Sequence, residues 1–202
     1  MEFWEKAFLD KQLMWGEAPA SAAQDAAHLF KENGFQNVLI PGFGYGRNAK
    51  PFFDAGFKVT GIEISKTAIS LSREFLGFHA NIFEGSVDNM PFDSNEYDGI
   101  FCHALIHLLD AEKRNLFISR CFYQLKSNGI MIFTAITKDA PTYGAGECIA
   151  TDTFKTKDGV NLFFYDEQSI KAEFENIGLI ESSIIEEQPA TKFWKIICRK
   201  PI

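Results

Sequence analysis

Three glycines at alternate positions follow directly on a short apolar run. The segment VLIPGFGYG begins at Val38 and contains Gly42, Gly44 and Gly46. Glycine adopts positive φ without steric cost and lets a ligand approach the main chain without a Cβ in the way. In an open parallel sheet, the turn after the first strand brings backbone N–H groups and a helix N-terminus towards a ligand. The run therefore predicts a strand, a tight turn that receives a large flat ligand, and then a helix.

The rest of the chain alternates strand-like and helix-like segments. Two helical patterns precede the first strand, and the second runs from Ser21 to a stop at Gly34. Further strands are predicted at FKVTGIEI, FHANIF, YDGIFC and IMIFTAI, with helices over 46–55, 65–76 and 111–125. Strands that alternate with helices form a parallel sheet covered by helices on both faces.

The C-terminal part changes this pattern. After Lys138 a stretch rich in Gly, Thr and Asp predicts a loop or an edge hairpin, and a helix follows over 166–176. The closing strands, LIESSIIEE and KFWKIICRK, are joined through Gln188-Pro189-Ala190. This pair must be antiparallel, because a parallel return needs a crossover. We therefore expect a doubly wound, Rossmann-like α/β fold with a seven-stranded, mostly parallel sheet and a C-terminal antiparallel hairpin.

Length and charge limit the kinds of partner. A chain of 202 residues with 46% hydrophobic composition suits one compact domain, residues 1–202. The net charge of −7 and the lack of a dense Lys/Arg run argue against nucleic acid and anionic membranes. The N-terminal segment predicts neither a signal peptide nor a membrane span, and the four cysteines form no CxxC pair. We expect a cytoplasmic monomer or homodimer with a small-molecule partner.

A carboxylate stands at the end of the strand that follows the glycines. Glu63 lies in GIEIS, 21 positions after Gly42. A carboxylate at about 20 residues beyond such a turn can accept hydrogen bonds from a ribose diol. The spacing is GxGxG, because Arg47 occupies the place of the last glycine of a dinucleotide motif. Together these features predict a nucleoside ligand, and an ordinary turn beside an exposed acid is the alternative.

Five segments, in order, resemble the class I S-adenosylmethionine-dependent methyltransferases, in particular the small-molecule, thiopurine and tellurite-resistance-like branches. They are VLIPGFGYG, GIEIS, EGSVDNMPF, YDGIFCHALIHLL and LKSNGIMIFTAI, within a likeness that runs from about Phe35 to Arg199. The resemblance implies S-adenosyl-L-methionine as cofactor and in-line transfer of its methyl group to a small-molecule acceptor. Ile40 and Ser86 depart from the family, which commonly has acidic residues at both positions.

The resemblance also implies roles for individual residues. Glu63 would bind the ribose hydroxyls, Ile64 would pack on the adenine, and Val87 would meet the adenine edge through its N–H group. Residues 1–34 would form a helical lid or cap, and 138–165 an insertion on the acceptor side. The implied cofactor site consists of Trp15, Gly42, Phe43, Gly44, Gly46, Glu63, Ile64, Ser86, Val87 and Cys102. Trp15 would lie over the cofactor, with a core anchor as its alternative role.

His103 and His107 are the candidate catalytic bases. They are four positions apart, so that on a helix they would share a face. A base is needed only for an acceptor that is protonated at working pH, whereas a thiolate or metalloid anion needs none. A structural role is the alternative for each histidine and is favoured for His107. No metal site is predicted, because no further Cys or His lies nearby at ligand spacing.

Two other functions fit parts of the sequence. A non-catalytic S-adenosylmethionine-binding or adaptor domain would account for Ile40 and Ser86. A nicotinamide-dependent oxidoreductase would account for the glycine turn but is disfavoured by Arg47.

Overall fold

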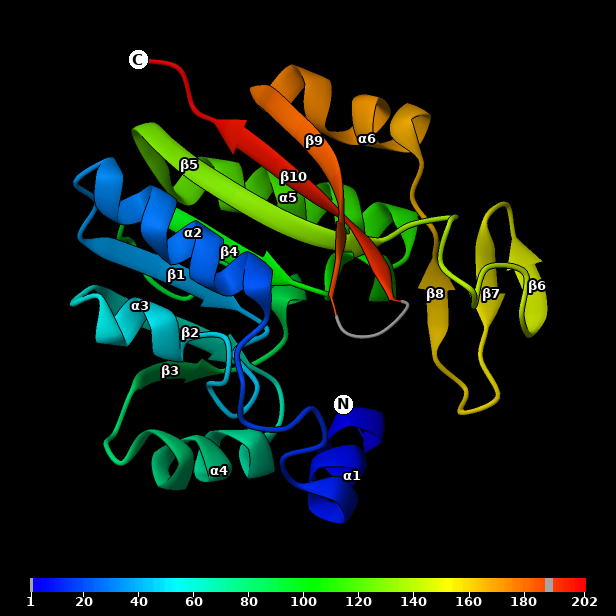
Figure 1. Cartoon of the computed structure of the whole chain (residues 1–202), viewed down its shortest axis with the longest axis horizontal. Helices are drawn as coiled ribbons and strands as arrows, with labels where there is room; N and C mark the ends of the chain where they lie inside the picture. The colour runs from blue at the N-terminus through cyan, green and yellow to red at the C-terminus, as the bar shows by residue number, and fades with distance from the viewer. Residues whose placement is uncertain (1, 188–190) are drawn as a thin grey trace.

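The computed structural model describes residues 2–187 and 191–202, so the connection predicted at Gln188-Pro189-Ala190 lies outside it. A seven-stranded sheet forms the centre of the molecule (Figure 1). Its strands are β1 (Asn37–Pro41), β2 (Lys58–Glu63), β3 (Asn81–Glu84), β4 (Tyr97–His103), β5 (Leu125–Ile136), β9 (Leu179–Glu186) and β10 (Lys192–Arg199). They lie in the order β3-β2-β1-β4-β5-β10-β9. The first five strands are parallel, and β10 is antiparallel to both β5 and β9, as predicted.

Helices cover both faces of this sheet (Figure 1). On one face, α2 (Ser21–Glu32) and α3 (Lys50–Asp54) pack against Val38 and Ile40 of β1. On the other face, α5 (Ala111–Gln124) and α6 (Glu167–Phe174) pack in a cluster that contains Leu39. Successive residues of a strand point to opposite faces, so β1 contributes to both cores.

The remaining helices lie towards the β3 edge and the N-terminus. α4 (Lys66–Leu76) begins after Ser65, whose side chain accepts a hydrogen bond from Ala68 N–H as the predicted cap. α1 (Glu2–Lys11) packs beside α4 (Figure 1). No helix among the described residues is long and apolar enough to cross a membrane. All four cysteines are free, and only Cys148 is exposed.

Two local predictions need correction. The helix predicted over 46–55 is limited to α3, because Gly46 has a φ of +88° and therefore belongs to a turn. The stretch after Lys138 contains a hairpin, one of the two predicted alternatives, but this hairpin pairs with a third strand in a separate antiparallel sheet and not with an edge of the main sheet. This second sheet consists of β6 (Glu147–Ala150), β7 (Thr153–Lys155) and β8 (Asn161–Phe163) and stands to one side of the main sheet (Figure 1).

Candidate functional site

The carboxyl ends of the parallel strands meet at one edge of the main sheet. β1 and β4 are neighbours, yet α3 follows β1 on one face and α5 follows β4 on the other. The chain therefore diverges between these two strands, and ligands of open α/β sheets bind at such a point. The strands β2, β1 and β4 are neighbours at this edge. The glycine turn follows β1, Glu63 is the last residue of β2, and His103 is the last residue of β4.

The glycine turn has a backbone conformation that favours glycine. Gly42, Gly44 and Gly46 have φ values of +72°, +57° and +88°. The N–H groups of Gly42 and Phe43 both donate to the carbonyl oxygen of Ile62, at 2.9 and 3.0 Å. A Cβ on Gly42 would lie 2.5 Å from Cδ1 of Leu105, whereas a Cβ on Gly44 would meet only Phe8 Cζ, at 3.9 Å. The main chain is thus most open at Gly44.

Glu63 joins the end of β2 to this turn. Its Oε2 accepts the N–H of Gly44 at 2.7 Å, and its Oε1 accepts those of Ile64 and Ser65 at 2.8 and 2.9 Å. The residue is only 6% exposed. Burial raises the pKa of Glu63, and the three backbone hydrogen bonds oppose that shift. The predicted pairing of the acid with the glycines is present in the structure.

The segment between α1 and α2 is tied to the glycine turn. The hydroxyl of Tyr45 donates to the carbonyl oxygen of Gly16 at 2.6 Å, and Nη1 of Arg47 donates to those of Trp15 and Ala18, each at 3.1 Å. The ring of Trp15 stacks on Tyr45 at 6.2 Å and is 42% exposed. Trp15 therefore lies on the surface beside the turn. No pattern in the sequence pointed to Arg47 as a contact of this segment.

Helix α1 is held at the same place by a carboxylate. Glu5 accepts hydrogen bonds from Ser65 Oγ and Thr67 Oγ1, both at 2.6 Å. These hydroxyl groups lower the pKa of Glu5. Phe8, one turn further along α1, is buried against Tyr45. Because Ser65 also donates its N–H to Glu63, α1 and the candidate ribose-binding acid share one neighbour.

The other predicted cofactor residues are placed differently. Ile64 is half-buried next to Glu63, and Ser86 accepts a hydrogen bond from Asp88 N–H at the start of the 3-10 turn η1 (Val87–Asn89). The side chains of Val87 and Phe43 are buried, the latter against Gly61.

The side chain of Cys102 points into the core on the α5 side of the sheet. Its thiol is 0% exposed in the core beneath α5, and burial raises its pKa. The side chains of Cys102, Phe43 and Val87 are thus all buried, and their roles in cofactor binding stay predictions.

The two histidines do not share a helix face, which corrects the sequence interpretation. His103 ends β4, and His107 lies in the 3-10 turn η2 (Ile106–Leu108). They are nevertheless close, because both rings contact Phe193. The ring centroid of Phe193 lies 5.7 Å from that of His103 and 6.0 Å from that of His107. Burial lowers the pKa of each imidazole to about 3, and the positive charge of Arg47 adds to the shift of His103. Both rings are thus neutral at pH 7.

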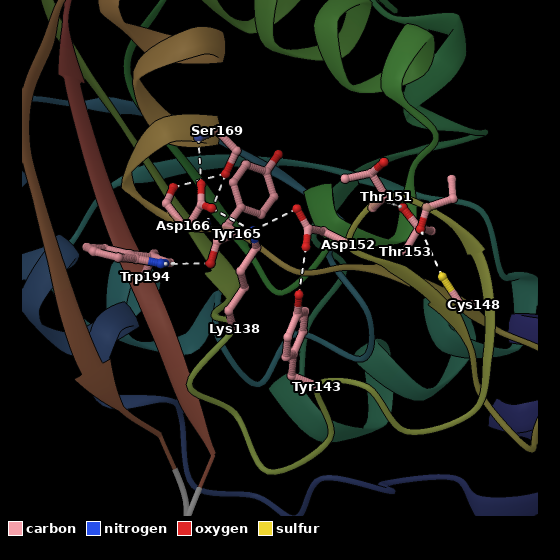
Figure 2. Close-up of polar contacts among 11 residues, drawn as sticks. Lys138, Tyr143, Cys148, Thr151, Asp152, Thr153, Tyr165, Asp166, Ser169 and Trp194 are labelled. Carbon is pink, nitrogen blue, oxygen red and sulfur yellow. Dashed lines mark hydrogen bonds and ion pairs between the residues drawn. The ribbon is translucent and has the colours of Figure 1, made fainter.

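Lys138, which the sequence analysis did not assign, connects the second sheet to the main domain (Figure 2). Its Nζ lies 2.7 Å from Oδ2 of Asp152 and 2.6 Å from Oδ2 of Asp166. Asp152 also accepts the hydroxyl of Tyr143 at 2.7 Å, and Asp166 caps α6. The partners of Lys138 are 14 and 28 positions away in the sequence, so no local pattern indicated them. Among the described residues, no group of His, Cys, Asp and Glu is arranged to hold a metal ion.

Comparison with known proteins identifies the family of this region. The methyltransferase-domain family matches residues 39–133, which include the glycine turn, Glu63 and His103. The segment 39–133 is thus similar to a methyltransferase domain. A protein of Geobacillus sp. (strain WCH70) with a provisional name as a methyltransferase is 27% identical over 128 residues. That match covers 59% of this chain and about half, 52%, of the relative's length.

Solved structures show the same fold as this chain. An S-adenosylmethionine-dependent methyltransferase from Clostridium acetobutylicum superposes with a TM-score of 0.75 at 11% identity, covering 100% of both chains. The 1,6-didemethyltoxoflavin-N1-methyltransferase of Burkholderia thailandensis gives 0.74 at 15% identity, covering 100% of this chain and 88% of that one. Its structure contains S-adenosylhomocysteine. The predicted Rossmann-like fold is confirmed, and the match over 39–133 agrees with the predicted methyltransferase family.

Proposed function

We propose that the protein is an S-adenosylmethionine-dependent methyltransferase that acts on a small-molecule acceptor by in-line displacement. The observation that carries this proposal is the 2.7 Å hydrogen bond between Glu63 and Gly44, which unites the candidate ribose-binding acid and the most open part of the glycine turn. The family match over 39–133 and the likeness to a structure with bound S-adenosylhomocysteine support it.

The residues at this edge fit such a cofactor. A carboxylate oxygen has two acceptor sites, so Oε2 of Glu63 retains one beside Gly44 N–H while Oε1 uses both of its own. One ribose hydroxyl would donate to the free acceptor site of Oε2. The second would take the site that Gly44 N–H now occupies. The S-adenosylmethionine sulfonium supplies an activated methyl group. The chain therefore has only to hold the acceptor in line and exclude water.

Two further segments complete the proposal. Residues 1–34 form a lid or cap, in which Phe8 and Trp15 lie beside the glycine turn. Residues 138–165 form the acceptor side, because Phe154 and Phe164 of this segment pack in one cluster with Phe193. Phe193 in turn contacts both histidines. We place these parts in a single domain, 1–202, that acts in the cytoplasm as a monomer or homodimer.

Methyl transfer from labelled S-adenosylmethionine tests this function. The purified protein is offered thiols, amines, phenols, carboxylates and metalloid oxyanions, and both the methylated product and S-adenosylhomocysteine are measured. The proposal predicts that both products form in equal amounts with at least one acceptor class. Binding of S-adenosylhomocysteine without transfer to any acceptor would favour the non-catalytic binding domain. No binding of either nucleoside, together with binding of NADH in a fluorescence titration, would overturn the assignment.

A further inference from the structure

The hydrogen bonds of the two histidines limit the chemistry of the acceptor. We propose that His103 presents an Nε2–H group as a hydrogen-bond donor and removes no proton, so that this site methylates an acceptor that is already ionised, such as a thiolate. The substrate class rests on the function proposed above. The state of the histidines follows from the structure independently of it.

Thr134 sets the tautomer of His103. Its Oγ1 lies 2.9 Å from Nδ1 of His103 and also accepts the N–H of Ala104 at 3.0 Å. Thr134 is fully buried on β5, and among the described residues no acceptor other than Nδ1 lies within hydrogen-bond distance of its hydroxyl. A buried donor without a partner is destabilising, so the hydroxyl proton points to Nδ1. Nδ1 is then the acceptor, and the proton of the neutral ring is on Nε2.

His107 has the same tautomer for a stronger reason. Its Nδ1 lies 3.3 Å from the backbone nitrogen of Ile136, which can only donate. The Nδ1 lone pair is therefore occupied by this bond, and the ring proton is on Nε2. His107 is buried, which fits a structural role in holding η2 against β5.

The surroundings of His103 keep its ring neutral and favour an anion beside it. The ring lies between the apolar side chains of Phe101 and Phe193, at 6.2 and 5.7 Å. The charged or titratable groups that act on it are Arg47, from the glycine turn, and His107. A positive guanidinium and an Nε2–H donor both complement a negative acceptor. Neither provides a site that takes up a proton.

The transfer step then balances without a base. The acceptor anion attacks the methyl carbon with its lone pair, and the bond from that carbon to the sulfonium sulfur breaks with its electrons going to sulfur. The products are the neutral methylated acceptor and neutral S-adenosylhomocysteine. No proton leaves the acceptor in the site, because it was lost to water before binding.

Nitrogen NMR of the imidazoles tests the histidine assignment directly. Long-range 1H–15N spectra of the histidine-labelled protein are recorded from pH 5 to 9, with the exposed His28 and His79 as references. His103 and His107 should each show a protonated Nε2 and a bare Nδ1 at every pH. An Nδ1–H tautomer of His103, or its protonation within this range, would overturn the proposal.

Variants of Thr134 test the cause of the tautomer. Thr134→Ser retains the hydroxyl and should leave the His103 signals in the Nε2–H pattern. Thr134→Val keeps the side-chain shape and removes the hydroxyl, so the His103 signals should shift towards a mixture of tautomers. An unchanged Nε2–H pattern in Thr134→Val would show that the hydroxyl does not set the ring state.

The pH dependence of methyl transfer tests the acceptor class. With a thiol of pKa about 8.5, the rate should rise about tenfold per pH unit from pH 6 to 8 and level off above. His103→Gln, which keeps an N–H donor near the Nε2 position, should show the same profile. A break near pH 6 to 7 that disappears in this variant would assign His103 as a base. Efficient transfer to un-ionised alcohols would also overturn the proposal, because it needs a base. Calorimetry with S-adenosylhomocysteine shows separately whether the cofactor proposal holds.

Discussion

Gly42 and Gly44 both have positive φ, yet the space around them differs. A non-glycine residue in this region costs roughly 1–2 kcal/mol. At Gly42 a Cβ would also overlap Cδ1 of Leu105, at 2.5 Å, whereas Gly44 has no neighbour closer than 3.9 Å. Because Cδ1 is the flexible end of the Leu105 side chain and can turn aside, we expect Gly42→Ala to lower the free energy of unfolding more than Gly44→Ala does, by only about 1 kcal/mol. Urea denaturation measures both values, and equal losses would contradict the packing argument.

At the residue scale, the sequence indicated positions better than orientations. The glycines and Glu63 were found because their spacing reflects the backbone of a strand–turn–helix unit. Cys102 was predicted as a cofactor contact from its position at the end of a strand; the structure adds that its side chain points to the face opposite to those of Phe101 and His103. The hydrogen bond from Thr134 to His103 joins two strands and could not be inferred from either one.

At the element scale, α1 is attached to the domain through Glu5. Because hydrogen bonds from Ser65 and Thr67 lower the pKa of Glu5, its contribution is present above its ordinary pKa of 4.5 and is lost as the pH falls through the lowered value. We expect Glu5→Ala to lower the protection factors for amide hydrogen exchange in α1 at pH 7, and acid to lower them in the wild type. Asp10 is on the same helix and is exposed, so Asp10→Ala serves as the control. Unchanged exchange in Glu5→Ala would show that α1 is held by other contacts.

The second sheet is attached through Lys138. Its ammonium lowers the pKa of Asp166 to about 2, so this contribution is complete above pH 3.8 and is lost as the pH falls towards 2. We expect Lys138→Met to expose residues 139–164 to limited proteolysis at neutral pH while the main sheet resists. Lys155→Met, on β7, is the matched control. If both variants resist digestion as the wild type does, the ion pairs do not hold this segment.

The elements that sequence patterns predicted best are those with a regular period. α4 was expected with Ser65 as its cap, and this is observed. The helix that corresponds to α3 was predicted too long, because the prediction included Gly46, which belongs to the turn. The second sheet was missed because its strands β6, β7 and β8 are short and largely exposed, so they lack an apolar alternation.

For the whole molecule, Phe133 on β5 links the sheet to two helices. Its ring lies 6.1 Å from Phe117 of α5 and 5.4 Å from Phe174 of α6, and it is fully buried. Removal of a buried aromatic ring costs about 3–5 kcal/mol. We expect Phe133→Ala to reduce the free energy of unfolding by that amount in urea, and Phe133→Leu to reduce it by less. A loss below about 1 kcal/mol for the alanine variant would contradict this packing.

The overall topology followed from the sequence because each strand–helix alternation permits few arrangements. Right-handed crossovers place parallel strand ends at one edge, and the closing pair had to be antiparallel. The observed strand order agrees with both inferences. The positions of α1 and of the second sheet depend on contacts between residues far apart in the chain, among them those of Glu5 and Lys138. Such contacts leave no periodic trace.

The most direct test of the account is the affinity for S-adenosylhomocysteine, measured by calorimetry in the wild type and in Glu63 and Glu84 variants. Glu84 is the register partner of Glu63 on β3 and is exposed, so Glu84→Ala should bind as the wild type does. Loss of charged hydrogen bonds to the ribose should weaken binding of Glu63→Ala by about 10- to 100-fold, with Glu63→Gln between the two. Wild-type affinity in Glu63→Ala would contradict the proposed cofactor site.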